Sequence, residues 1–170
     1  NACYTLDTRS LQQTPINWPA GTRPINLHID AEDKIWCALG TWMSCFDGNT
    51  YQDFVLDFPA EQFEGVLRSN HALLASSGEL VAIPISKIRS AGKLSKSMAD
   101  WKIPCPDAML CKLEDSSGNV WVGQNGKGIL KVNPGFRRVQ HLFAGNSVYG
   151  AVFSESNGVV SAVLPTKMLV

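Results

Sequence analysis

An all-β fold is predicted by three observations on the 170-residue sequence. Short apolar or alternating runs bounded by turn residues recur along the chain, whereas sustained helical periodicity is hardly found. Acidic turns and tryptophan-bearing runs return at similar distances, and each repeated unit holds four short strands. Units of about 40 residues with four strands are typical of propeller blades, in which each sheet needs neighbours on both faces. The sequence therefore predicts a β-propeller of about four four-stranded blades, either part of a larger propeller or closed by strand completion.

Two segments follow one template of strand, acidic turn, Trp-bearing strand, tight turn and strand, ending in Asp-Gly or Pro-Gly. They are "LHIDAEDKIWCALGTWMSCFDGN" at 27–49 and "CKLEDSSGNVWVGQNGKGILKVNPG" at 111–135, and segments 66–85 and 151–170 fit as less regular copies. The first turns are centred near Asp33, Asn70, Ser117 and Asn157, at successive spacings of 37, 47 and 40 residues. We expect one domain over 1–170, a propeller or a propeller fragment, with repeat units at approximately 25–60, 61–104, 107–144 and 148–170.

The fourth strands of the first three units are predicted in "YQDFVLDF", in a segment within 94–104, and in "RRVQHLF". The stretch "SKIRSAGKLSKSMADWK" is rich in Ser and Lys, which predicts a solvated surface insertion. Residues 61–68 and 87–100 are the candidates for a helical turn. A strand from residues 2–18 is the alternative route to closure, because it would complete the last blade of a four-bladed ring.

The run "GNVWVGQNGKGILKVNPG" at 118–135 holds five glycines and looks like a phosphate-binding loop. A nucleotide fingerprint needs a helix after its glycines, but a β run ended by Pro-Gly follows here. Asn125-Gly126 is instead the favoured two-residue hairpin turn, in which both residues take positive φ. This turn predicts that Val122 lies opposite Ile129 and Trp121 opposite Leu130.

Composition excludes several classes of protein. With 45% hydrophobic and 18% charged residues, and 15 basic against 15 acidic ones, the chain matches neither a disordered tail nor a nucleic-acid binder. No apolar stretch approaches the roughly 20 residues of a membrane-spanning helix. Because the chain begins with Asn1, we expect a processed product or an excised piece of a longer polypeptide.

The five cysteines show no CxxC pair and no zinc spacing, so no metal site is expected. They are Cys3, Cys37, Cys45, Cys105 and Cys111. Cys37 and Cys45 have the spacing to face each other across a hairpin. The commoner role of such residues is that of small buried hydrophobic side chains.

The residues "EDSSGNVWVGQNGKGILKVNP" (114–134) and "DAEDKIWCALGTWMSCFDG" (30–48) resemble the two-component-regulator propeller repeat. In that repeat an acidic turn and Gly-Asn precede an "lWiG" strand, a glycine-containing turn and a strand ending in Asp or Asn. Departures are Ala38 and Leu39 in place of "iG", no Trp before Gly78, and Ser161 in place of Trp. The resemblance implies the periplasmic or extracellular sensor portion of a bacterial hybrid two-component system, often responding to carbohydrate fragments, with seven blades per propeller being common.

Propeller ligands generally bind on the face made by the loops between second and third strands and the loops that link blades. The first set of loops maps to Gly40-Thr41-Trp42, Ser76-Ser77-Gly78, Gln124 to Lys127, and Pro165-Thr166; the second includes 18–23, 59–62, 104–107 and 145–147. The indole of Trp42 offers a flat face for stacking on a sugar ring, with packing against the adjacent blade as the alternative. The candidate ligand-binding residues are Trp42, Thr41, Ser77, Gln124, Asn125 and Lys127. Trp36 and Trp121, in mid-strand, are expected to be structural.

Catalytic residues are not evident, because His28, His71 and His141 fall on different parts of a blade and do not converge. The acidic residues at the first turns, Glu32, Asp33, Glu114 and Asp115, suit backbone capping better than a glycosidase pair. We therefore expect a sensing module without cofactor, metal or nucleic acid. Its expected partners are a small molecule or oligosaccharide, the remaining blades or signalling domains of a parent polypeptide, and a second copy of the chain. The competing hypotheses are a propeller-fold enzyme, either streptogramin-lyase-like or carbohydrate-active, and a protein-interaction scaffold.

Overall fold

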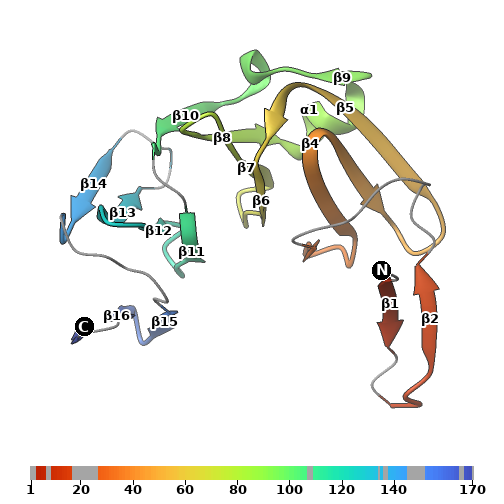
Figure 1. Cartoon of the computed structure of the whole chain (residues 1–170). Coiled ribbons are helices and arrows are strands. Elements are labelled where there is room, and N and C mark those ends of the chain that lie inside the picture. The colour runs from red at the N-terminus through yellow and green to blue at the C-terminus, as the bar shows by residue number, and fades with distance from the viewer. Residues whose placement is uncertain are drawn as a thin grey trace.

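The computed structural model describes residues 3–6, 9–16, 27–106, 109–133, 135, 138–144, 152–164 and 167–169. In these ranges nearly all regular structure is β, in small sheets that follow one another along an open arc (Figure 1). The predicted all-β propeller fold is therefore confirmed. We call the sheets built on β3, β6, β11 and β15 blades 1 to 4.

Blade 1 has the strand order β3-β4-β5-β9. The strands are β3 (His28–Ile29), β4 (Ile35–Phe46), β5 (Tyr51–Ala60) and β9 (Lys93–Leu94). The beginning of β4 pairs with β3 and its end pairs with β5. Gly40 has φ +62°, and the register shifts between Gly40 and Trp42. The prediction of a turn between two strands at Gly40-Thr41-Trp42 is thus wrong, since these residues form an irregularity within the single strand β4.

Blade 2 has the order β10-β8-β7-β6. The strands are β6 (Gln62–Val66), β7 (His71–Ser76), β8 (Glu79–Pro84) and β10 (Trp101–Pro104), so the fourth strand predicted within 94–104 is confirmed. Residues 61–68 hold the strand β6 and no helix, which corrects one helical candidate. The runs "HALLAS" and "ELVAIP" are apolar without alternation because blade 2 is buried on both faces.

The insertion after β8 is a structural part of blade 1. It forms helix α1 (Ile85–Ser90), β9 and the 3-10 turn η1 (Lys96–Met98), and β9 runs parallel to β5. Ile85, Ile88 and Leu94 are buried in the core between blades 1 and 2. The prediction of a solvated loop was wrong, because the many Ser and Lys residues mask a few apolar side chains spaced to reach that core.

Blade 3 has the order β11-β12-β13-β14. The strands are β11 (Met109–Glu114), β12 (Val120–Gln124), β13 (Gly128–Val132) and β14 (Val139–Leu142), the last lying within the predicted "RRVQHLF". The hairpin has a three-residue loop, 125–127, so Val122 lies opposite Leu130 and Trp121 opposite Lys131. The predicted register was off by one residue. Asn125 does not take positive φ, whereas Gly126 and Gly128 do.

Blade 4 is described as β15 (Val152–Ser156), β16 (Val159–Leu164) and β17 (Lys167–Leu169). The N-terminal strands β1 (Cys3–Leu6) and β2 (Gln13–Ile16) pair only with each other, in a hairpin at the other end of the arc from β15 (Figure 1). Among the described residues, the N-terminal segment therefore does not complete the last blade. Within the described ranges, strand completion to a closed four-bladed ring is therefore not observed.

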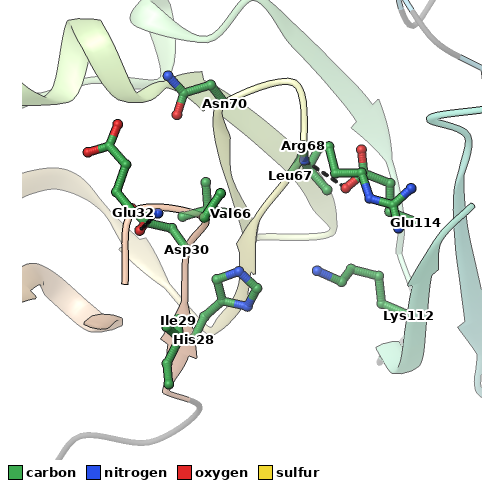
Figure 2. A pocket seen from close by; sticks show the side chains of 11 residues that line it. His28, Ile29, Asp30, Glu32, Val66, Leu67, Arg68, Asn70, Lys112 and Glu114 are labelled. Carbon is green, nitrogen blue, oxygen red and sulfur yellow. Dashed lines mark hydrogen bonds between the residues drawn. The ribbon is translucent and has the colours of Figure 1, made fainter. Parts of the chain in front are cut away.

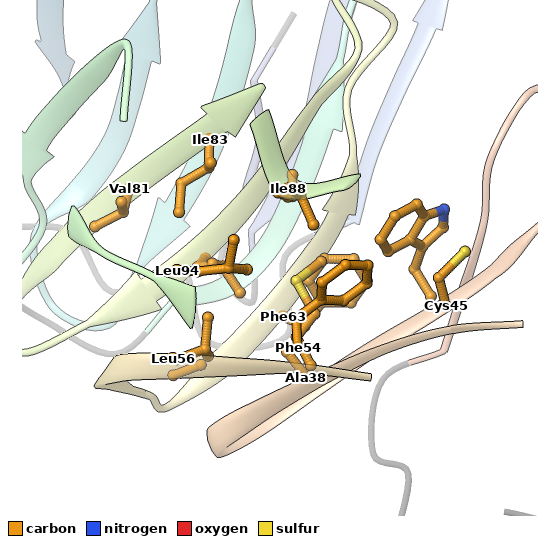
Figure 3. Close-up of a cluster of buried hydrophobic side chains, with 14 of the residues drawn as sticks. Ala38, Cys45, Phe54, Leu56, Phe63, Val81, Ile83, Ile88 and Leu94 are labelled. Carbon is orange, nitrogen blue, oxygen red and sulfur yellow. The ribbon is translucent and has the colours of Figure 1, made fainter. Parts of the chain in front are cut away.

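The cores lie between successive blades, as a propeller requires. One cluster joins blades 1 and 2, and in it Trp36 stacks on Phe54. Figure 3 shows Phe54 and Phe63 in this cluster. A second cluster joins blades 2 and 3, and a smaller one joins blades 3 and 4. Burying apolar surface contributes about 25 cal/mol per Å² to stability. Each blade therefore stabilises its neighbour by covering one of its apolar faces.

Candidate functional site

A cavity of about 470 Å³ opens where the inner strands and first turns of three blades meet (Figure 2). Blade 1 contributes residues 28–32, blade 2 contributes residues 66–68 and 70, and blade 3 contributes Lys112 and Glu114. We call this space the first-turn cavity. It lies at the first turns and not among the loops between second and third strands, where sequence analysis placed the ligand.

The first turns of blades 1 and 3 are each built around one aspartate. Asp30 Oδ1 accepts hydrogen bonds from the main-chain N–H groups of Glu32 (2.8 Å) and Lys34 (3.0 Å), and Oδ2 accepts one from Trp36 Nε1 (2.7 Å). Burial opposes ionisation of Asp30, but these hydrogen bonds outweigh it and lower the pKa of the carboxyl. The first turn of blade 1 is thereby tied to the buried Trp36, six residues after Asp30.

Blade 3 repeats this arrangement. Asp115 Oδ1 accepts hydrogen bonds from the N–H groups of Ser117 (3.0 Å) and Asn119 (2.8 Å), and Oδ2 accepts one from Trp121 Nε1 (2.7 Å). The repeated Asp-to-Trp hydrogen bond explains why acidic turns and tryptophans recur together in the sequence. The predicted structural role of Trp36 and Trp121 is confirmed, and Asp30, not Glu32 or Asp33, is the capping residue of blade 1.

Neighbouring first turns are also joined to each other. The Arg68 N–H of blade 2 donates to Glu114 Oε2 of blade 3 (2.8 Å), and Arg68 Nη1 donates to the Asp115 carbonyl (3.3 Å). The Ser116 N–H of blade 3 donates to Glu155 Oε2 of blade 4 (2.8 Å). Polar contacts between blades therefore run along the face on which the cavity opens.

Two ionisable groups meet between blades 2 and 3 beside the cavity. Lys112 Nζ donates a hydrogen bond to the main-chain carbonyl of Glu64. Burial raises the pKa of the Glu64 carboxyl to about 7, against the opposing charge of Lys112, and burial lowers the pKa of Lys112. Glu64 Oε1 is buried and has no hydrogen-bond partner among the described residues. The described residues thus leave part of the hydrogen-bonding capacity of Glu64 and Lys112 unused.

His28 stands on the opposite wall and points toward Lys112 across the cavity (Figure 2). Its ring lies on Gly65, where a β-carbon would be 2.5 Å from His28 Nδ1, and it meets Phe63 edge to face at 6.4 Å. Gly65 has φ +104° in a bulge of β6, so both its conformation and this close approach require glycine. Burial, followed by the charge of Lys112, lowers the pKa of His28.

The six predicted ligand-binding residues do not share one cavity. Thr41 is exposed and Trp42 half-buried in β4, whereas Asn125 and Lys127 are exposed in the hairpin turn of blade 3. Gln124 is buried, and its Nε2 donates to Cys105 Sγ (3.3 Å). Ser77 lies in the turn between β7 and β8, where its N–H donates to Glu61 Oε1 (3.0 Å).

A smaller cavity of about 290 Å³ does lie on the predicted face. It is lined by Ser76, Gly78, Glu79 and Cys105, among others. Of the other predicted loops, Pro165-Thr166, 18–23, 145–147 and Asp107 lie outside the described residues. In the described part of the linking loops, Glu61, Gln62 and Pro106 line this smaller cavity.

Sequence reasoning missed the residues that converge at the first-turn cavity. The available signal was the polar residue within each innermost strand, His28, Glu64 and Lys112, where a purely structural strand of a propeller would be apolar. The three histidines indeed stay apart, since His71 pairs with Asp100 Oδ2 (3.1 Å) and His141 lies in the outer strand β14. His28 instead converges with Lys112, a pairing that depends on tertiary structure.

Other features of the described residues limit the chemistry. No group of three or more His, Cys, Asp or Glu side chains in the described ranges is arranged to hold a metal ion. Cys37 and Cys45 are both buried, and burial raises the pKa of the Cys45 thiol to about 11. No helix of the described chain is long and apolar enough to span a membrane.

Comparison with known proteins gives structural likeness only. No protein-family model matches the sequence, and no curated protein matches it. Among solved structures, the chain is similar to one described as the extracellular domain of the hybrid two-component system BT4673 from B. thetaiotaomicron, with a TM-score of 0.67 and 17% identity over 95% of this chain. It is also similar to a streptogramin B lyase, with a TM-score of 0.57 and 16% identity over 86% of this chain.

A third similar structure is a protein of unknown function from Bacteroides caccae, with a TM-score of 0.57, 11% identity and 96% of this chain covered. The chain spans 25% of the BT4673 domain, 53% of the lyase and 61% of the B. caccae protein. At these identities the likeness concerns the fold, and it extends over nearly all of the chain. The chain has a β-propeller fold, and over 95% of its length it is similar to about a quarter of the extracellular domain of a bacterial two-component system.

Proposed function

We propose that this chain is part of the ligand-binding propeller of an extracytoplasmic bacterial receptor, and that a small ligand, no larger than a short oligosaccharide, occupies the first-turn cavity. The observation that carries the proposal is the cavity itself, about 470 Å³ at the junction of three blades, with ionisable groups on its inner strands. Volumes of this order accept small ligands. The likeness to an extracellular domain of a two-component system supports the location and the sensing role.

The contacts around the cavity also support a sensing role. The walls come from three blades, and the first turns of blades 2 and 3 are joined through Arg68 and Glu114. A ligand that contacts all three walls would favour one relative placement of the blades over another, and the differential contact energy sets how far it shifts that equilibrium. The receiving partners would be the remaining blades or signalling domains of a parent polypeptide.

The proposal is tested by blocking the cavity. Ala31 lines the cavity and is exposed at a first turn, so Ala31→Trp should fill the space without disturbing a core. Binding would be measured by calorimetry against a panel of neutral and acidic oligosaccharides, with Asn49→Trp, in the exposed turn between β4 and β5, as the matched control. We expect binding to be lost in Ala31→Trp and kept in Asn49→Trp.

Loss of binding in Trp42→Ala or Lys127→Ala, with Ala31→Trp unaffected, would instead favour the opposite face. That face holds the residues first predicted for ligand binding, Trp42, Thr41, Ser77, Gln124, Asn125 and Lys127. If no member of the panel binds to the wild-type chain, the carbohydrate-sensing proposal fails.

An enzyme is the second candidate, and one observation favours it. The Glu64 carboxyl, with a pKa raised by burial to about 7, lies beside Lys112 close to the cavity, and groups that titrate near neutrality are suited to proton transfer. Turnover of a bound oligosaccharide that disappears in Glu64→Gln would support a propeller-fold enzyme. Saturable binding without turnover supports the sensor.

A further inference from the structure

The acidic side chains of the first-turn cavity are already engaged by the protein. Both oxygens of Asp30 accept hydrogen bonds from within its own turn. Glu32 Oε2 accepts from Lys34 Nζ (2.6 Å) and Arg89 Nη2 (3.2 Å), and Glu114 Oε2 accepts from the Arg68 N–H (2.8 Å). Each of these three carboxylates is therefore held by donors of the protein itself.

The donors of the cavity are, in contrast, incompletely used. Lys112 is half-buried, and its ammonium has three protons to donate but bonds a main-chain carbonyl, that of Glu64. No carboxylate of the described residues lies within 4.0 Å of Lys112 Nζ. The charges of Glu64 and Glu114 act on Lys112 without a direct ion pair. A partly buried ammonium without such a pair is costly unless another anion supplies it.

His28 lies on the opposite wall, where its ring hydrogen-bonds the main chain of Val66. Its protonated form has a second N–H to donate. Its ring is fixed by the close packing on Gly65 and points toward Lys112 (Figure 2). The charge of Lys112 disfavours the protonated imidazole, as the lowered pKa of His28 indicates. An anion between the two nitrogens would relieve that repulsion and accept hydrogen bonds from both sides.

We propose that the ligand of the first-turn cavity carries an anionic group, such as the carboxylate of a uronic acid, and that this group lies between Lys112 Nζ and the imidazole of His28. This inference rests on the proposed function, because it names the chemical class of ligand for the same cavity. Lys112 supplies the charge, and His28, once protonated, supplies a second N–H beside the one that its ring donates to the main chain of Val66. The neighbouring Arg68 stays engaged with Glu114 and Asp115.

The experiment compares three probes that differ at one carbon, namely methyl glucuronide, methyl glucoside and methyl glucoside 6-sulfate. Binding to the wild-type chain and to Lys112→Met would be measured by calorimetry and by ligand-observed NMR. We expect the glucuronide to bind at least about tenfold more tightly than the glucoside, since a hydrogen bond to a charged group contributes that much. Lys112→Met should remove this preference. The sulfate separates a demand for a carboxylate from a demand for any anion.

The matched control is Lys102→Met, because Lys102 is exposed in β10 and distant from the cavity walls. Thermal unfolding of both variants verifies that they fold, and the wild-type preference among probes does not depend on either variant. Equal binding of acidic and neutral probes, lost in Ala31→Trp, would overturn the anion inference and leave the proposed function standing. Failure of every probe to bind would overturn both.

Discussion

Glu64 illustrates how a single residue can be held in an unfavourable setting by the fold. It lies between Phe63 of the core and Gly65 at the bulge, so the strand pairing of β6 fixes its position. Its buried carboxyl faces the neighbouring strand β11, where Lys112 bonds its main-chain carbonyl. Burial therefore dominates over charge pairing and raises the pKa of this carboxyl to about 7.

The raised pKa of Glu64 predicts a specific dependence of stability on pH. The folded state holds the Glu64 proton up to about pH 7, whereas the unfolded state releases it near the ordinary value of 4.5. The folded state thus binds more protons in this window, so the contribution of Glu64 to the free energy of unfolding falls as pH rises from 4.5 toward 7. Glu64→Gln should remove this contribution and be more stable than wild type above pH 7, by on the order of 1 to 3 kcal/mol.

Urea unfolding of both proteins across this pH range measures the effect as the difference between the two stability curves. The difference is needed because the lowered pKa of His28 acts in the opposite direction. Asp57→Asn, at an exposed position of β5, should follow the wild-type curve. Parallel curves for wild type and Glu64→Gln would show that Glu64 is ionised in the folded state and would contradict the prediction.

Among the elements, the insertion between β8 and β10 changes the architecture most. Its helix α1 places Ile85 and Ile88 on the core between blades 1 and 2, and β9 extends blade 1 by pairing with β5. Lys87 of α1 bonds Asp100 Oδ1 (2.7 Å), and Lys96 bonds Glu79 Oε2 (3.1 Å). Both the apolar and the polar side chains of the insertion therefore attach it to the rest of the protein.

Truncation of this insertion in the core should be costly. Leu94→Ala or Ile88→Ala removes a fully buried side chain, and we expect a loss of about 2 to 4 kcal/mol in the free energy of unfolding. Denaturant unfolding measures this loss, with Leu6→Ala, at an exposed position of β1, as the control that should change stability by less than about 0.5 kcal/mol. If Leu94→Ala and Ile88→Ala lowered the free energy of unfolding no more than the control does, the insertion would not contribute to the core, as expected of a solvated loop.

The elements show why the sequence predicted the blades better than their details. Strand positions follow from apolar runs and turn residues, which are local signals. The register of the blade 3 hairpin was missed because Gly128, not Asn125, takes the positive φ: a β-carbon at Gly128 would lie 2.4 Å from the carbonyl oxygens of Leu142 and Phe143. That constraint comes from β14, which no local pattern reveals.

At the scale of the whole molecule, blade 1 has one face turned to blade 2 and one without a neighbouring blade in the described chain. Val55 pairs opposite Trp42, and Ile29 opposite Ile35, so these side chains share the second face with Leu39. Ile29, Leu39 and Val55 are 61%, 39% and 54% exposed. In blades 2 and 3 the corresponding face is covered by the preceding blade.

We therefore expect the isolated chain to self-associate through this face of blade 1. Sedimentation equilibrium of the wild-type chain should give an average mass above that of the monomer, and Val55→Glu should lower it, because a charge in an apolar contact is disfavoured. Val139→Glu places the same change on β14, at a position that is also exposed, and should have no effect. A wild-type chain that stays monomeric at high concentration would contradict this expectation.

The candidate site shows the limit of local reasoning most clearly. The six residues chosen from loop positions are spread over different places, whereas the cavity joins His28, Arg68 and Lys112 from three blades. These residues are far apart in the sequence and meet because successive blades place their inner strands side by side. Their convergence follows from the curvature of the whole assembly, so the repeat pattern alone could predict the blades but not the cavity.

The late position of β9 in the chain has a consequence for folding during synthesis. Blade 1 obtains its last strand from chain that follows β8, so a nascent chain released from the ribosome only as far as Pro84 still lacks the residues that cover Leu56 and close that edge. Domains and repeats otherwise tend to fold in the order in which they are synthesised. Here the first two blades are expected to mature together, as one cooperative unit.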